Sequence, residues 1–170
     1  MFRKLLTVCF CLVFVFAAGC SGQPAAKNNT VNNNKEPQEE NPLEAYADAV
    51  VGHALSVSAQ IKIINDDLES TTMDKELKTA AIETNASVLR IHLGEAWTIE
   101  PPENLKDLHE EYLLSLEKIN EGLACLEQWA KDGNKDALTR GQEIIAEGMR
   151  DGAVFAKQLN TEILVEQHRR

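Results

Sequence analysis

The sequence predicts an all-α domain at residues 43–170, an up-down-up-down antiparallel four-helix bundle preceded by an apolar leader and a polar tether. Three observations lead to this prediction. Apolar residues recur at spacings of three and four from residue 43 onward, which is the helical period. The only prolines in this part of the sequence are the adjacent pair Pro101 and Pro102. Capping residues divide it into four segments with short connections, which favour antiparallel neighbours.

The first two helices are expected at residues 42–68 and 73–97. Asn41 suits the N-cap of the first helix with Pro42 in its first turn, and Thr72 suits the N-cap of the second. The stripe of the first helix consists of Leu43, Tyr46, Val50, His53, Val57, Ile61, Ile64 and Leu68. The second stripe is the least apolar of the four: Leu77, Ala81, Thr84, Val88, Ile91 and Glu95, with Ile82 and Leu89 alongside.

The third helix is expected at residues 102–132, with Gly133 as its left-handed cap, and the fourth runs to about residue 166 from an Asn134 N-cap. The third stripe consists of Leu105, Leu108, Tyr112, Leu116, Ile119, Leu123, Leu126 and Ala130. The fourth consists of Leu138, Gly141, Ile145, Gly148, Gly152, Phe155, Leu159 and Ile163. Each glycine costs about 1 kcal/mol relative to alanine inside a helix. Three on one face therefore predict a close approach of two helices, with a groove as the alternative.

Residues 1–19 have the organisation of a signal peptide. Arg3 and Lys4 form a short basic start, and residues 5–18 are uncharged and strongly apolar. This run is shorter than the roughly 20 residues that a membrane-spanning helix needs. It fits the apolar region of a signal peptide, which is removed from the mature protein.

The leader ends in Ala17-Ala18-Gly19-Cys20, which resembles the lipobox of bacterial lipoproteins. The resemblance implies that Ala17, Ala18 and Gly19 are recognised by lipoprotein signal peptidase and that Cys20 carries covalent diacylglycerol. Ala17 departs from the leucine that is commoner at that position. An ordinary secretory peptide, with Cys20 as an incidental thiol, is the alternative. No other cofactor is expected.

Residues 20–42 should form a flexible tether behind the lipidated cysteine. They are rich in Asn, Gln, Glu, Lys and Pro, and Val31 is their one large aliphatic residue. Such a segment cannot bury enough apolar surface to offset its ordering entropy. A chain of this length has a root-mean-square span of roughly 25 Å. We therefore expect the domain to lie close to the cell membrane, on its extracytoplasmic face.

Charge and cysteine content exclude several classes of function. The chain has 27 acidic residues against 17 Lys and Arg, a net charge of −10. This balance argues against binding nucleic acid, which needs clustered basic residues. Cys125 would be the only cysteine left in the domain after processing, so no internal disulfide is expected. Its position between Ala124 and Leu126 predicts a buried or half-buried thiol without nucleophilic activity.

The histidines are the remaining candidates for chemistry. His53 lies on an apolar stripe, and a b-type haem could use it with Met149 or His92. His109, followed by two glutamates, could bind a divalent cation with Glu103 or Asp107, although a solvated helix face is the simpler interpretation. The Glu-x-x-His pairs of di-iron bundles and the Cys-x-x-Cys-His of c-type haem are both missing from the sequence. We therefore predict no catalytic residue, no metal site and no enzymatic activity.

Residues 101–116 are similar to a pattern found in uncharacterised helical-bundle lipoproteins, mainly of Gram-positive bacteria. The pattern is a Pro-initiated helix with a histidine and an aromatic residue in its first turns, here Pro101, His109 and Tyr112. It implies a fold and a compartment rather than an activity. The leading functional hypothesis is a membrane-anchored, non-enzymatic domain that binds a protein or an envelope component, with no oligomeric state predicted. The alternative is a lipoprotein that binds a small ligand, metal or haem through His53 or His92.

Overall fold

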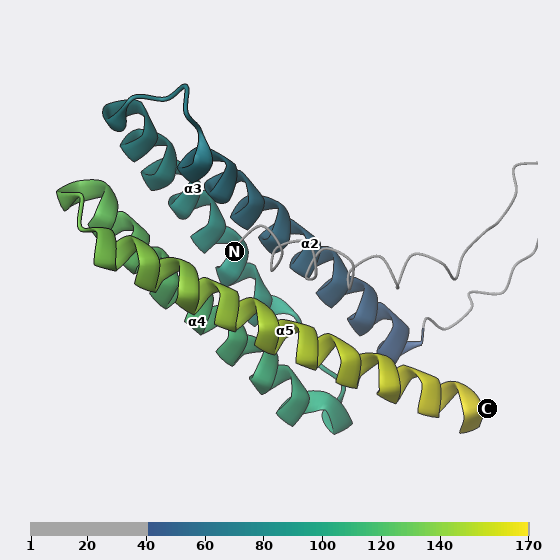
Figure 1. Cartoon of the computed structure of the whole chain (residues 1–170). Coiled ribbons are helices and arrows are strands. Elements are labelled where there is room, and N and C mark those ends of the chain that lie inside the picture. The colour runs from purple at the N-terminus through teal and green to yellow at the C-terminus, as the bar shows by residue number, and fades with distance from the viewer. Residues whose placement is uncertain (1–40, 170) are drawn as a thin grey trace, which may run out of the picture. The chain divides into compact units, whose positions relative to one another are not determined.

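A computed structural model describes residues 41–169, and this part of the chain is a bundle of four α-helices without a strand (Figure 1). The helices are α2 (Pro42–Glu69), α3 (Lys75–Glu95), α4 (Lys106–Asp132) and α5 (Lys135–Arg169), with the short 3₁₀ turns η2 (Ala96–Thr98) and η3 (Glu103–Leu105) between α3 and α4. The predicted helical bundle is thus confirmed. The leader, the lipobox with Cys20 and most of the tether lie outside the described residues. None of the described helices combines the length and the apolar character that crossing a membrane requires.

Helices α4 and α5 approach so closely that a side chain would not fit at two of the glycines between them. A Cβ atom on Gly148 would lie 2.6 Å from the carbonyl oxygen of Ser115, and one on Gly141 would lie 2.8 Å from that of Gly122. The predicted close approach is therefore confirmed at these two glycines. Gly152 has more room, with Ser115 Oγ at 3.5 Å. The contacts move toward the start of α4 as they move toward the end of α5, so the two helices run in opposite directions.

The turn between α4 and α5 is as compact as the sequence predicts. Gly133 has a φ of 74°, and its N–H donates to the carbonyl oxygen of Trp129 at 2.8 Å. A left-handed residue at this position is favourable only for glycine. The Asn134 side chain then accepts a hydrogen bond from the backbone N–H of Asp136 at 3.0 Å, which caps the start of α5.

Helices α2 and α3 are joined by polar side chains rather than by close backbones. Gln60 Nε2 donates to Asn85 Oδ1 at 3.0 Å, and Asn85 Nδ2 donates to Asp67 Oδ2 at 2.7 Å. Lys78 Nζ closes the connection at the end of α2 by donating to the carbonyl oxygens of Leu68 and Ser70. Hydrogen bonds from polar side chains therefore supplement the apolar packing of this pair of helices.

The predicted inner face of α3 is wrong, and so is its predicted cap. Leu77 and Ile91 are 56% and 65% exposed, and the core-facing residues of α3 are Ile82, Ala86, Leu89 and Leu93, of which the sequence places Ile82 and Leu89 beside the predicted stripe. Both sets follow the helical period, and the set with Leu89 and Leu93 fills more of the core. The residues on the opposite side, here called the outer α3 stripe, are Leu77, Ala81, Thr84, Val88 and Ile91. The N-cap is Asp74 instead of Thr72, because its carboxylate accepts from the N–H of Leu77 at 2.8 Å.

The remaining boundaries differ from the prediction by small amounts. Leu105 N–H donates to the carbonyl oxygen of Pro102 at 2.8 Å, which makes the first turn after the prolines a 3₁₀ turn and delays α4 to Lys106. Helix α5 continues to Arg169, a few residues beyond the expected end.

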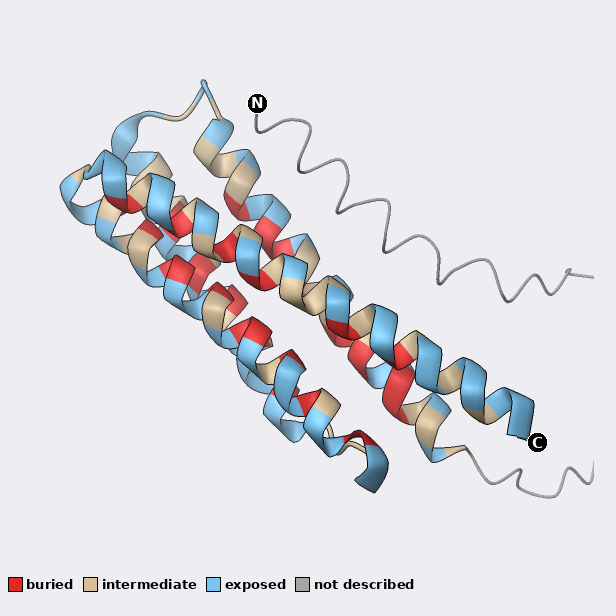
Figure 2. Cartoon of the chain, turned by 60° about the horizontal axis from the view of Figure 1, so that its bottom comes forward, coloured by how far each residue is buried: buried red, intermediate tan, exposed pale blue. Residues whose placement is uncertain are grey.

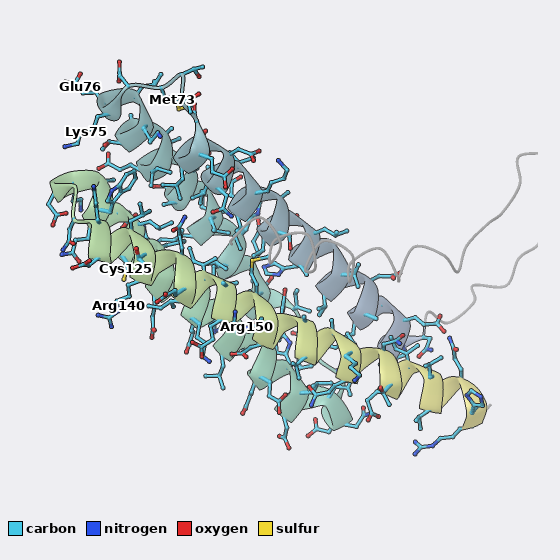
Figure 3. All side chains as sticks on the ribbon, in the orientation of Figure 1. Met73, Lys75, Glu76, Cys125, Arg140 and Arg150 are labelled. Atoms are coloured by element: carbon cyan, nitrogen blue, oxygen red, sulfur yellow. The ribbon has the colours of Figure 1, made fainter. Side chains whose placement is uncertain are left out.

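The other three predicted stripes do supply the core (Figure 2). The Cys125 thiol is half-buried next to α5, as expected: a Cβ on Gly141 would lie 3.1 Å from the Cβ of Cys125. Figure 3 labels this side chain at the α4–α5 contact.

Candidate functional site

Two tyrosines and two histidines form a polar network inside the otherwise apolar core. Tyr46 and His53 come from α2, and His109 and Tyr112 come from the first turns of α4. All four side chains are at least 92% buried. The helical spacing explains their placement, since residues seven apart on α2 and three apart on α4 share a face.

His53 is hydrogen-bonded through both of its ring nitrogens. Its Nε2 lies 2.6 Å from the backbone carbonyl oxygen of His92, and its Nδ1 lies 2.5 Å from Tyr112 Oη. A carbonyl oxygen only accepts, so Nε2 carries the hydrogen and donates it. In the neutral ring Nδ1 is then an acceptor, and the Tyr112 hydroxyl donates to it. This arrangement connects α2 to α3 and to α4 through one side chain.

The second pair joins the start of α2 to the start of α4. Tyr46 Oη lies 3.0 Å from His109 Nδ1, and the two rings meet edge to face with centroids 5.8 Å apart. Burial raises the pKa of Tyr46 to about 12 and lowers the pKa of His109 below its ordinary value of 6.5. Both groups are therefore neutral near pH 7, as a buried pair without a counter-ion requires.

Tyr112 brings the fourth helix into the network. Its ring stacks on Phe155 of α5, with centroids 4.6 Å apart and an interplanar angle of 21°, and meets His53 edge to face. Burial, together with the nearby Tyr46, raises the pKa of Tyr112, so its hydroxyl stays protonated and available as a donor. Aromatic pairs of this kind contribute about 0.5–1.5 kcal/mol each beyond the area they bury. The network thus connects all four helices.

The network's chemistry is that of a structural cluster. A metal or haem iron at His53 would have to displace either Tyr112 or the carbonyl of His92. The ring of His92 has a different partner, since its Nδ1 lies 3.0 Å from Glu95 Oε2 near the surface. Met149 packs partly buried against the core. Within residues 41–169, no group of three or more His, Cys, Asp and Glu side chains is placed to hold a metal ion.

His109 lies in a different environment from the one that its neighbours suggest. Glu110 and Glu111 are exposed, as expected for a solvated face, but His109 itself is buried against Tyr46. The sequence does indicate that His109 is buried, because it shares the helical spacing of three and four with positions 112, 116, 119 and 123. His109 therefore belongs to the core-facing side of α4 rather than to a surface cation site with Glu103 and Asp107.

Outside the network, ion pairs connect the helices near the surface. The guanidinium of Arg90 on α3 forms two hydrogen bonds to the Glu127 carboxylate on α4, one of them 2.9 Å long. This pairing lowers the pKa of Glu127 and raises that of Arg90. Lys118 on α4 bridges Glu147 and Asp151 on α5 at 2.7 Å each, and these two partners raise its pKa. Arg90 and Lys118 are thus both paired with carboxylates of a neighbouring helix.

Comparison of the chain with family models, with curated proteins and with solved structures finds no match. Evidence on function therefore comes from the chain's own residues and contacts.

Proposed function

We propose that this chain is a lipoprotein of the bacterial cell envelope, anchored in the cell membrane through diacylglycerol on Cys20. Its domain, on the extracytoplasmic face, binds a protein or an envelope component and is not an enzyme. The observation that carries the proposal is the order of features in the leader: a basic start, an apolar run and then Ala17-Ala18-Gly19-Cys20. Each buried methylene contributes roughly 0.8 kcal/mol, so two acyl chains make a stable anchor.

The proposed domain is an up-down-up-down bundle on a flexible tether. Contacts between residues of decreasing number on one helix and increasing number on the next support this topology, as at Gln60–Asn85 followed by His53–His92. Short connections between consecutive helices support it as well. Such a bundle presents its outer helix faces to partners without needing an internal cavity.

The hydrogen bonds of His53 favour a binding module over a cofactor protein. Both ring nitrogens already have partners within the core, and the Tyr112 hydroxyl is oriented by the same contact. Losing a buried partner costs about 1–3 kcal/mol, so a ligand at His53 would have to offset that loss. Leu77 and Ile91 on the outer side of α3, in contrast, are exposed and need no rearrangement to be contacted.

The anchor is tested by replacing Cys20 and supplying the cells with an alkyne-tagged fatty acid. In the wild-type chain we expect the tag to be incorporated and the leader to be removed. In Cys20→Ala we expect neither, because the thiol that accepts the lipid is gone. Cys125→Ala is the matched control, since it removes the domain's own thiol and should be labelled normally. Full labelling of the Cys20→Ala chain would refute the anchor.

A further inference from the structure

The polar network joins α2 to α4 through two buried histidines, one on each helix. His53 and His109 are 8% and 6% exposed. His53 on α2 is hydrogen-bonded to Tyr112 on α4, and His109 on α4 is hydrogen-bonded to Tyr46 on α2. The two pairs therefore cross the same interface in opposite directions, and each of them contains a group that can take up a proton.

Within residues 41–169, the hydrogen-bond partners of both rings are uncharged. His53 contacts a hydroxyl and the backbone carbonyl of His92, and His109 contacts a hydroxyl. Neither His53 nor His109 forms an ion pair with another described residue. Burial is the cause of the lowered pKa of His109. A positive charge on either ring would therefore be enclosed without a counter-ion, which is strongly unfavourable.

The charged side chains near the network in sequence lie outside it on all four helices. The neighbouring carboxylates of α2, α3 and α4 are exposed: Glu44, Asp48, Glu95, Asp107, Glu110 and Glu111. The neighbouring cations are exposed, as Lys106 and Lys157 are, or paired, as Arg90 is with Glu127. On α5, Phe155 stacks on the network, and Asp151 is paired with Lys118. The titratable groups that contact the His109 ring within the described residues are thus Tyr46 and Tyr112.

The contact between α4 and α5 is built without a buried histidine of its own. Its closest approach is at glycines where a Cβ would not fit. His168, the histidine of α5, is exposed and is hydrogen-bonded within its own helix to the carbonyl oxygen of Leu164. Protonation of a buried histidine therefore acts on the attachment of α2, while the close approach of α4 and α5 has no corresponding group.

We propose that the polar network is an acid-sensitive latch, in which a proton taken up by His109 releases α2 from α4 while α4 and α5 stay packed. The closed latch needs a neutral ring, because its partners are uncharged. The released ring is hydrated and can hold the charge, so acid favours the open form. Opening exposes the apolar inner face of α2, which makes this face available to a partner in acid and withholds it near pH 7. This regulation rests on the proposed binding function, whereas the latch itself does not.

The test is hydrogen exchange of the full chain at pH 7, 6 and 5, followed by mass spectrometry and corrected for the intrinsic pH dependence of amide exchange. Exchange reports local opening segment by segment. With the ordinary pKa of 6.5 for the released His109, one proton linked to opening favours the open form by roughly tenfold between pH 7 and pH 5. We expect the protection of α2 amides to fall by about tenfold and that of α5 amides to change by less than about twofold.

Matched histidine variants assign the proton. In His109→Gln the ring is gone, so the protection of α2 should differ by less than about threefold between pH 7 and pH 5. His109→Phe keeps an aromatic ring beside Tyr46 and serves the same purpose if the Gln variant does not fold. His168→Gln is the control, because it removes an exposed histidine of α5 and should behave as the wild type. Circular dichroism at pH 7 verifies that the variants fold.

Several outcomes would overturn the proposal: protection of α2 that does not change with pH, or the wild-type fall in a variant without His109. An equal fall in α2 and α5 would also overturn it, because the whole domain would then unfold in acid. Loss of the fall in His168→Gln would assign the proton to the wrong helix and have the same consequence. Exchange reports on α2 and fatty-acid labelling reports on Cys20, so the failure of one proposal is distinguishable from the failure of the other.

Discussion

The two pairs of consecutive helices are held together in different ways. In α4 and α5 the backbones themselves touch, with the positions of missing Cβ atoms 2.6–2.8 Å from carbonyl oxygens of α4 at Gly148 and Gly141. In α2 and α3 the contact passes through side chains, from Gln60 to Asn85 and from His53 to the backbone of His92. The first pair depends on steric fit between backbones, and the second adds directional hydrogen bonds to its apolar packing. The same helical period therefore produces two kinds of interface, which respond to different substitutions.

The largest effect is expected from adding a methyl group to the α4–α5 contact. In Gly148→Ala the new Cβ would meet Ser115 O at 2.6 Å and Ile119 Cγ1 at 2.8 Å, so the helices must separate. Overpacking costs about 1–3 kcal/mol, and strain against backbone should exceed the gain of about 1 kcal/mol in helix propensity. We expect the free energy of unfolding, measured in urea, to fall by about 2 kcal/mol.

Gly52→Ala is the matched control for this prediction. Gly52 lies inside α2, and a Cβ at this position meets nothing within 4 Å. The same change should therefore stabilise the chain by up to about 1 kcal/mol through helix propensity. Two substitutions of equal chemistry should thus change stability in opposite directions. If Gly148→Ala were also stabilising, the close approach of α4 and α5 would be disproved.

The attachment of α2 should respond instead to the loss of a hydroxyl group. Tyr112→Phe keeps the ring stacked on Phe155 but leaves Nδ1 of His53 without its donor in a buried site. An unsatisfied buried acceptor costs about 1–3 kcal/mol. We expect a loss of about 1.5 kcal/mol in urea unfolding, with unchanged helix content. Wild-type stability in this variant would mean that the hydroxyl contributes nothing to the contact between α2 and α4.

The smallest effect is a dependence of stability on pH that originates at His109. Burial lowers its folded-state pKa below the ordinary 6.5, so the unfolded chain binds more protons as the pH falls. The stability should therefore decrease from pH 7 to pH 5 and level off below the lowered pKa. In His109→Gln this slope should be shallower in urea unfolding at pH 5, 6 and 7.

The Glu127 carboxylate acts in a lower pH window than His109. The pKa of Glu127 is lowered from its ordinary 4.5 by Arg90, so its contribution is present above that value and is lost below it. If the slope of stability between pH 5 and pH 7 is unchanged in His109→Gln, the acid sensitivity originates at other groups and not at this histidine.

The sequence was most informative where one residue type satisfies one local requirement. Gly133 is predictable because a left-handed residue must end α4, and Asn134 because a side-chain oxygen must cap α5. The glycines of α5 were predictable for a similar reason, since a costly residue repeated on one face needs a packing explanation.

Residues with two equivalent options could not be assigned from the sequence. Helix α3 has two apolar stripes of the same period, and only the shape of the core formed by the other helices selects Leu89 over Ile91. Thr72 and Asp74 are both good caps, and the loop geometry decides between them. His109 is polar, and its burial depends on Tyr46, which lies 63 positions away in the sequence.

The hydrogen-bonded attachment of α2 has a mechanical consequence. The chain enters the bundle at Pro42, so any tension along the preceding segment is applied first to the start of α2. Hydrogen bonds between Tyr46 and His109 and between His53 and Tyr112 hold this end of α2 to α4. Both contacts end on α4, so tension on α2 is passed directly to the α4–α5 pair. The hydrogen-bonded contacts of α2 therefore carry a load applied at Pro42 into α4.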